Sequence, residues 1–482
     1  MILTMLTVLM RTYRIPVALV LLLGASCSVK TPPSVPEVVE EALPETTAIP
    51  LDFESAAAAA TGQVRDGWLK TFGDPGLEAI VAEAIQNNLN LRAAVAKVDA
   101  AAGFATQAGA ELKPAIGVGG QALNRDGFSS GDPYVTSTGV SLNVSWELDI
   151  WGRVRAQAQA GQAAFEAAQY ELEWAYQSIA AQTAKTWFLV TEAQLQERLA
   201  EEALGLYERT VELVEVKFDV GQVTQKELSL ARANVATGQV ALRQARRGRQ
   251  QAARALELIL GRYPAADIEG AIDLVATPPP IPVGVPSELL ERRPDMLAAE
   301  RAVAAEFLQL ESARAARLPR IGLTAGTGNS STDLNDVLQL GSGYWSVGAN
   351  FFAPIYQGGA LQAQVEIETA GQETALANYG MAALKAFGEV EQGLDNETLL
   401  REQEAYLDVA VREASEALRI AQDQFDVGRV DLLSVLQQQG QVLAARVQLL
   451  NIRDQRLQQR VDLHLAVGGG FEAPKPEEGE KP

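Results

Sequence analysis

The stretch Ser141–Arg153, which reads SLNVSWELDIWGR, passes from one kind of local structure to another with almost no loop. Four apolar residues alternate with three polar ones along Val140, Ser141, Leu142, Asn143, Val144, Ser145 and Trp146. A period of two is typical of a strand with one apolar and one polar face. After Gly152 and Arg153 the apolar spacing becomes helical. The stretch therefore predicts a two-faced strand that leads directly into a long helix.

The chain carries an internal repeat. FDVGQV from Phe218 and FDVGRV from Phe425 align without gaps, at an offset of 207 residues (425 minus 218). The same offset pairs Val240 with Val447, Leu242 with Leu449, Arg246 with Arg453, Gln251 with Gln458, Leu256 with Leu463 and Gly261 with Gly468. Self-similarity of this length indicates one structural unit built twice. Each half has the order helix, strand, strand, long helix, reversal, long helix.

Four strands and four long helices follow from this plan. The strands are expected at about 116–124, 136–146, 321–328 and 344–352, and the long helices at about 153–219, 222–261, 358–424 and 429–467. Proline, which breaks helix interiors, is absent between Pro133 and Pro264 and between Pro354 and Pro474. The first repeat then covers 66–262 and the second 295–471. A linker, 263–294, joins them, which the resemblance described below would place at the equator of the channel, and a disordered tail, 472–482, follows.

The strands have the length that crosses a bilayer when tilted in a barrel, about 10 residues. Aromatic residues lie at their ends, as in the girdles of membrane barrels: Trp146, Trp151, Tyr344 and Trp345. Four strands cannot close a barrel, and an open sheet edge is not tolerated in lipid. The barrel must therefore be shared between copies of the chain. Two copies would fill the interior with side chains, whereas three copies leave room for a lumen.

The N-terminus reads as an export signal. Arg11 and Arg14 precede the apolar run 17–23, and the single cysteine, Cys27, follows it. A plain signal peptide is one interpretation. The favoured one is a lipoprotein signal, with residues 1–26 removed, Cys27 lipidated and 27–65 forming an extended tether rich in Pro, Glu, Thr and Ala.

Composition argues against several functions. The chain has 40 Lys and Arg against 61 Asp and Glu, a net charge of −21, so nucleic-acid binding is not expected. No phosphate-binding glycine loop, catalytic triad or metal-ligand cluster is present in the sequence pattern. The single histidine, His464, lies among helical leucines and is interpreted as structural. We therefore expect no enzyme activity, no cofactor and no metal.

The chain resembles the TolC-type outer-membrane efflux proteins, in the lipoprotein branch that serves multidrug exporters. The resemblance runs from about Trp68 to Phe471. It rests on the following strings: WLKTFGDPGL from Trp68, SWELDIWGRVR from Ser145, IPVGVPSELLERRPDMLAAE from Ile281, APIYQGGALQA from Ala353 and VDLHLAVGGGF from Val461. Ala360 departs from the family, which usually carries Arg after the two glycines.

The resemblance implies a mainly α-helical fold with a membrane β-barrel part, completed by a homotrimer to twelve strands and a tunnel of twelve long helices. It implies passive export of small molecules through the outer membrane, with a periplasmic adaptor and an inner-membrane pump as partners. In such a barrel Val140, Leu142, Val144 and Trp146 face lipid and Ser141, Asn143 and Ser145 face the lumen. A protein-secretion channel of the same fold and a non-conducting helical lipoprotein are the alternatives.

The resemblance also assigns the two FDVG segments to the periplasmic tips. The predicted adaptor-docking residues are Val220, Gly221, Gln222, Val427, Gly428 and Arg429. Family members often carry a gating Asp nine positions after the second tip glycine, where this chain has Gln437. Asp431 is the nearest acid. A ring of Asp431 side chains is one possible entrance gate, but a stabilising charge at a helix start is the favoured interpretation of this residue.

Overall fold

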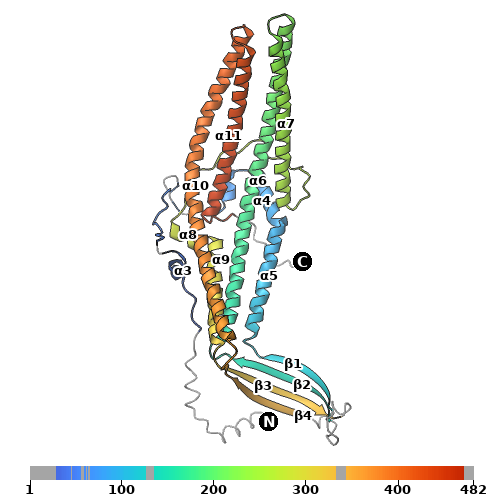
Figure 1. The fold of residues 1–482 in the computed structure, drawn as a ribbon, viewed down its shortest axis with the longest axis vertical. Coiled ribbons are helices and arrows are strands. Elements are labelled where there is room, and N and C mark those ends of the chain that lie inside the picture. The colour runs from blue at the N-terminus through green and yellow to red at the C-terminus, as the bar shows by residue number, and fades with distance from the viewer. Residues whose placement is uncertain are drawn as a thin grey trace. The chain divides into compact units, whose positions relative to one another are not determined.

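A computed structural model describes residues 29–44, 46–55, 59–60, 62, 64, 66–125, 135–332 and 343–471. The expected signal peptide, its Cys27 and the tail 472–482 lie outside the described residues. Within them the chain is mainly helical, with one four-stranded antiparallel sheet, in the predicted order (Figure 1). The elements are α3 (Val35–Ala42), η3 (Trp68–Phe72), α4 (Pro75–Asn87), α5 (Leu89–Ala110), β1 (Ala115–Arg125), β2 (Val135–Leu148), α6 (Arg153–Asp219), α7 (Gln225–Ile259), α8 (Pro286–Arg292), α9 (Pro294–Ala315), β3 (Arg320–Ser331), β4 (Gly343–Phe352), α10 (Ala360–Asp426) and α11 (Leu432–Ala466).

The chain divides into two compact units. The strand unit comprises the described parts of 1–44, 98–168 and 299–379, and it contains the sheet. The hairpin unit comprises the described parts of 45–97, 169–298 and 380–482. It contains α7 and α11 and the parts of α6 and α10 that follow residues 168 and 379, which form the α6–α7 and α10–α11 hairpins.

The sheet has the order β1-β2-β3-β4, and each strand pairs with the next. Residues directly opposite one another on neighbouring strands lie on the same face of the sheet, so the register defines rows of residues that run across all four strands. One row runs Ile116, Val144, Ala325, Val347, and the next runs Gly117, Asn143, Gly326, Ser346. In these two rows the alternation seen in β2 therefore extends across all four strands.

The direct passage from β2 into α6 depends on a few side chains. Asp149 accepts hydrogen bonds from the backbone N–H groups of Val154 (3.0 Å) and Arg155 (2.9 Å), which satisfies donors that a helix start leaves free. Gly152 has a φ of 80°, a conformation open to glycine. Arg153 binds both carboxylate oxygens of Glu147 at 3.1 Å. The string WELDIWGR thus encodes the turn itself.

The tether predicted over 27–65 is not extended throughout, which corrects the expectation from its composition. Residues 35–42 form α3, started by a capping box in which Ser34 and Glu37 exchange hydrogen bonds. Val38 is buried, and Lys30 forms an ion pair with Glu311 of α9 at 3.4 Å. Proline within the first turn favours a helix, because that turn needs no donor from it.

The helices of the two hairpins have matching lengths: α6 and α10 have 67 residues each, counting the parts that lie in the strand unit, and α7 and α11 have 35 each. The returning helices begin later than the predicted positions 222 and 429, because a capping residue intervenes in each. Thr224 caps α7, and Asp431 caps α11. The reversals lie at Gly221 and Gly428, whose φ values are 74° and 73°.

The core of the hairpin unit surrounds the string that begins at Trp68. Trp68, Phe72 and Phe188 belong to one buried cluster with residues of α4, α7 and α11. Asp74 caps α4 and also accepts a hydrogen bond from Trp187 Nε1 at 2.8 Å. His464 stacks on Trp68, with ring centroids 5.7 Å apart, and burial lowers its pKa to about 3. The single histidine is therefore a neutral core residue.

None of the helices in the described ranges combines the length and the apolar composition that a membrane-crossing helix needs.

Candidate channel surfaces and docking tips

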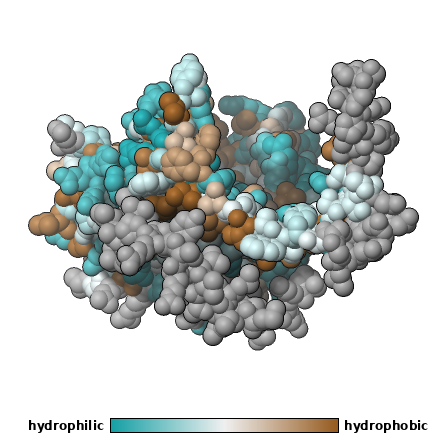
Figure 2. Space-filling view, turned by 90° about the horizontal axis from the view of Figure 1, so that it is seen from below, coloured by the Kyte–Doolittle hydropathy of each residue, from teal (hydrophilic) through white to brown (hydrophobic). Residues whose placement is uncertain are grey.

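The apolar face of the sheet, which carries the row through Val144, is exposed in the single chain. Ile116, Val118, Val347 and Phe351 are each about 70% exposed, and Val140, Leu142 and Trp146 of β2 are partly exposed. Figure 2 shows apolar residues, in brown, on the surface beside hydrophilic ones. Contiguous exposed apolar residues mark a surface that contacts lipid or another protein.

Around Asn143 the opposite face of the sheet is polar and built from small residues. Asn143 Nδ2 donates to Ser141 Oγ at 2.8 Å. A Cβ at Gly326 would lie 3.2 Å from both Asn143 Oδ1 and Ser346 Oγ, which is tighter than ordinary contact. Glycine at this position therefore leaves room for the Asn143 side chain.

Two tryptophans attach the strands to their neighbouring segments. Trp146 Nε1 donates to the carbonyl of Leu112, which precedes β1, at 3.1 Å. Trp151 Nε1 donates to the carbonyl of Pro319, which precedes β3, at 2.6 Å. Each bond joins segments that are distant in the sequence, so these tryptophans fix the level at which strands give way to helices.

The predicted tip residues lie at the reversals of the two hairpins. Val220 and Val427 are 65% and 68% exposed, and nothing lies within 4 Å of a Cβ built on Gly221 or Gly428. The two tips are joined in the single chain. Lys217 Nζ donates to the carbonyl of Phe425 at 3.1 Å and lies 4.1 Å from the centroid of its ring. A buried cluster extends beneath, formed by Val214, Leu228, Ala231, Phe425, Leu432, Val435 and Leu436.

Asp431 is placed as a helix cap. Its Oδ1 accepts from Ser434 Oγ at 2.7 Å and from Ser434 N at 3.0 Å, and these bonds lower the pKa of Asp431. This geometry favours the helix-start interpretation. Gln437 lies on the same helix, and its side chain is exposed.

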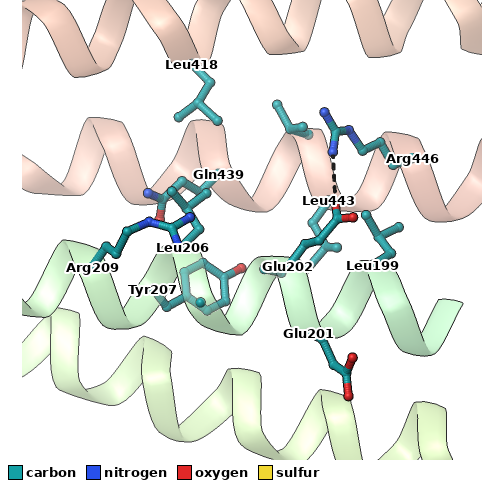
Figure 3. Close-up of a pocket in the computed structure, with 13 residues that line it drawn as sticks. Leu199, Glu201, Glu202, Leu206, Tyr207, Arg209, Leu418, Gln439, Leu443 and Arg446 are labelled. Atoms are coloured by element: carbon teal, nitrogen blue, oxygen red, sulfur yellow. Dashed lines mark ion pairs between the residues drawn. The ribbon is translucent and has the colours of Figure 1, made fainter. Parts of the chain in front are cut away.

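A cavity of about 410 Å³ lies between α6 and α11 in the hairpin unit (Figure 3). Glu202 and Arg446 form an ion pair across it at 3.8 Å, and Tyr207, Arg209 and Gln439 line its other end. Its mixed lining includes leucines but no set of metal ligands. Across the described residues, no group of three or more His, Cys, Asp or Glu side chains is arranged to hold a metal ion.

Sequence reasoning missed a pair of ion-pair clusters. In the first hairpin Arg246 and Arg249 bind Glu197 at 3.0 and 2.6 Å, and Arg246 also binds Glu201 at 2.8 Å. In the second, each position 207 residues later does the same: Arg453 and Arg456 bind Glu404, and Arg453 binds Asp408 at 3.1 Å. Arg246 and Arg453 were already paired by the offset. Extending that comparison to acidic residues would have found the clusters.

A buried acidic pair was also missed. Glu192 of α6 and Asp454 of α11 are 6% and 5% exposed. Burial, with the nearby Glu192 carboxylate, raises the pKa of Asp454 to about 7, and burial raises the pKa of Glu192. Asp454 Oδ1 has no hydrogen-bond partner among the described residues. Sequence spacing could not reveal the pair, because its members come from different halves of the chain.

The sequence was compared with protein families and with individual proteins. The pattern of the outer membrane efflux protein family matches residues 80–262 and 285–469. The pyoverdine export outer membrane protein OpmQ of Pseudomonas aeruginosa is 30% identical over 422 residues, covering 84% of this chain and 88% of that protein. The probable outer membrane lipoprotein SilC of Salmonella typhimurium is 26% identical over 441 residues, which cover 90% and 95% of the two chains.

Solved structures show the same fold. The Campylobacter jejuni CmeC outer membrane channel superposes with a TM-score of 0.82 at 25% identity, covering 93% of this chain and 96% of that one. The four-stranded sheet and the paired long helices are therefore those of an outer membrane channel, as the resemblance implied.

Proposed function

The chain belongs to the outer membrane efflux protein family, and from this premise we propose that it is the outer-membrane channel of a tripartite efflux system, active as a homotrimer. The observation that carries the proposal is the four-stranded sheet with one apolar face, one polar face and two edges, β1 and β4, left unpaired in the described chain.

The edges require further copies of the chain. A sheet edge in hydrocarbon leaves backbone groups unsatisfied, at several kcal/mol each. Pairing β1 of one copy with β4 of the next removes both edges. Three copies then give twelve strands, enough for a lumen lined by the polar face that carries Ser141, Asn143 and Ser145, while the row through Val144 meets lipid.

Transport in this proposal is passive, and the protein performs no chemistry. The inner-membrane pump supplies the energy and selects the substrate, which we take to be a small molecule. OpmQ, one of the relatives, is named for export of pyoverdine.

The tips provide the docking surface for the periplasmic adaptor. Val220 and Val427 are exposed beside the reversing glycines, and Gln222 and Arg429 complete the surface. The N-terminus provides a lipid anchor at Cys27. Its support is the apolar run 17–23 shortly before Cys27 and the relative SilC, which is named as a probable outer membrane lipoprotein. Lys30, three residues after Cys27, is paired with Glu311 of α9, four residues before the end of that helix.

Planar-bilayer recording on the purified oligomer tests the proposal. We expect ion conductance that rises when the contact between the tips is weakened by Lys217→Ala, because Lys217 joins the two hairpins at Phe425. Absence of conductance from both proteins would support a non-conducting helical lipoprotein instead.

The facing of the barrel strands has a matched test. Leu142→Asp places a charge on the apolar face of β2. Asn143→Asp places the same charge one residue further along, on the polar face. At the bilayer midplane an Arg or Lys on the lipid face costs roughly 2–4 kcal/mol and an Asp somewhat less, so Leu142→Asp should reduce the amount of assembled oligomer in outer membranes while Asn143→Asp leaves it near wild type. Equal tolerance at both positions would contradict the facing.

A further inference from the structure

The cavity of about 410 Å³ between α6 and α11 (Figure 3) has the size and the mixed lining of a small-molecule site. Its apolar wall consists of Leu199, Leu206, Val442 and Leu443. At one end Glu202 and Arg446 pair with each other at 3.8 Å. The other end is formed by Tyr207, Arg209 and Gln439, and it is there that polar groups remain open to a ligand.

Gln439 presents a buried acceptor that lacks a donor. The residue is 3% exposed, and its Nε2 donates to Thr210 Oγ1 at 3.1 Å. Thr210 Oγ1 uses its own proton in a hydrogen bond to the carbonyl of Leu206 at 2.9 Å, so it can only accept from the amide, which fixes the orientation of that amide. Gln439 Oε1 is left without a hydrogen-bond partner among the described residues. A buried acceptor in this state is unfavourable until a donor reaches it.

Arg209 supplies a positive charge at the same end of the cavity. Its Nη1 lies 3.6 Å from the position that a Cβ on Gly205 would take, so the guanidinium folds back along α6 over a residue that has no side chain. Within the part of the chain that the structure describes, Arg209 forms no ion pair or hydrogen bond. The acidic residues of the lining are each paired with another arginine. The cavity therefore offers one uncompensated positive charge.

Tyr207 forms the wall between these groups and α7. A Cβ on Gly238 of α7 would lie 2.9 Å from Tyr207 Cδ2, closer than real side-chain contacts, so glycine at this position admits the tyrosine ring. Burial raises the pKa of the Tyr207 hydroxyl, which therefore stays neutral near pH 7. Three helices thus shape the polar end of the cavity before any ligand arrives.

The repeat shows that the hairpin plan does not require these polar groups. At the offset of 207 residues Tyr207, Arg209 and Gln439 correspond to Ala414, Glu416 and Arg232. Glu416 is bound by Arg419 at 2.7 Å, and Arg232 binds Glu215 at 2.8 Å. The corresponding charges are therefore satisfied within the chain, whereas those of the cavity are left open.

We propose that this cavity binds a small amphipathic anion in which a carboxylate, an N–H group and an apolar body lie close together. The carboxylate pairs with Arg209, the N–H group donates to Gln439 Oε1, and the apolar body packs on the leucines. An amino acid that carries an acyl or arylsulfonyl group on its nitrogen has this arrangement. Because Arg209 belongs to α6 and Gln439 to α11, the bound molecule ties the two hairpins together. The inference does not depend on conduction through the channel.

Dansylglycine, a fluorescent N-arylsulfonyl amino acid, tests the site in the full-length protein held in lipid nanodiscs. Dansylsarcosine replaces its N–H proton by a methyl group, and dansylamide lacks its carboxylate. Fluorescence titration should give a dissociation constant for dansylglycine that is roughly tenfold lower than for either analogue, because each analogue loses one hydrogen-bonding group. Equal constants for the three probes would indicate partition into lipid or onto an apolar surface and would overturn the proposal.

Substitutions at the cavity locate the binding. Arg209→Gln should weaken dansylglycine binding by roughly tenfold, because a charge-assisted bond is lost, and should leave dansylamide binding unchanged. The matched control is Arg243→Gln, which removes an exposed arginine of α7 and should change neither constant. Gly205→Leu places a side chain beneath the Arg209 guanidinium and should weaken the binding of all three probes. An Arg209→Gln protein that binds dansylglycine as tightly as the wild type would place the ligand elsewhere and overturn the site.

Discussion

The two helical hairpins, α6–α7 and α10–α11, share one backbone plan but carry different side chains. Their helices match in length, their reversing glycines share the same φ, and each contains an arginine pair clamped on a glutamate 207 residues from its counterpart. These shared features depend on the hairpin alone. Geometry that a hairpin needs for its own stability therefore recurs in both halves.

The hairpins differ where they meet other parts of the unit. In the second, Arg460 is 1% exposed and binds Glu397 at 2.6 Å and the carbonyls of Pro278 (2.8 Å) and Pro279 in the linker. The equivalent positions in the first hairpin are Ala253 and Val190, both buried in apolar surroundings. The second hairpin thus uses a buried charge to hold the linker, and the difference reflects a contact that has no counterpart in the first half.

The largest loss in the free energy of unfolding is expected from removing the buried charge of Arg460. Arg460→Met leaves Glu397 buried with only a distant Arg456 (4.0 Å) and leaves two carbonyls unpaired. Breaking a buried pair in this way costs about 3–5 kcal/mol. Chemical denaturation of the detergent-solubilised protein should show this loss, and Arg419→Met, which removes an exposed ion pair of α10, serves as the control.

The double variant with Glu397→Val and Arg460→Met sharpens the comparison, because it gives the second hairpin the apolar character of the first. It should be more stable than Arg460→Met alone, since no buried carboxylate remains. If the double variant is less stable than the single one, the linker carbonyls and not Glu397 dominate the energy of the site.

A smaller, pH-dependent effect is expected from Asp454, whose counterpart in the first hairpin is Arg247. The folded-state pKa of Asp454 is raised to about 7, so the stability that its protonated form contributes is complete below pH 4 and is lost as the pH rises through 7. Three pKa units correspond to roughly 4 kcal/mol at most. Asp454→Asn should reduce this fall in thermal stability to the part contributed by Glu192, whose pKa burial also raises, and Glu208→Gln, an exposed change on α6, should preserve the whole fall. If the thermal stability of the Asp454→Asn variant falls with pH as much as that of the wild type, other titrating groups cause the pH dependence.

Periodicity and the repeat were sufficient to predict the order of elements and the two-faced character of the strands, because both are local patterns. The alternation around Leu142 needed only its neighbours. The helix starts were displaced by a few residues because Thr224 and Asp431 act through hydrogen bonds to the backbone, which spacing does not show. The helix over 35–42 was missed since its Pro and Glu content was taken as typical of an extended tether.

The candidate sites also differ in whether a local sequence pattern could predict them. The tip glycines were identified because each half contains one, whereas the acidic pair and the Arg460 contact join segments from different halves. Glu192 and Asp454 are 262 positions apart (454 minus 192). A buried contact between distant segments leaves no periodic trace, so only the folded chain reveals it.

The smallest effects concern the tips, where the hairpins agree. Gly221→Ala and Gly428→Ala each place a Cβ at positive φ, with a cost of about 1–2 kcal/mol from backbone strain alone, because nothing within 4 Å obstructs the new atom. The losses in thermal stability should be equal.

Gly221→Trp and Gly428→Trp add bulk to the same strain, so they should abolish export in a drug-accumulation assay while the oligomer persists. Export that survives both tryptophan variants would remove the tips from the docking surface, and unequal losses in the alanine variants would show that the reversals differ in their surroundings.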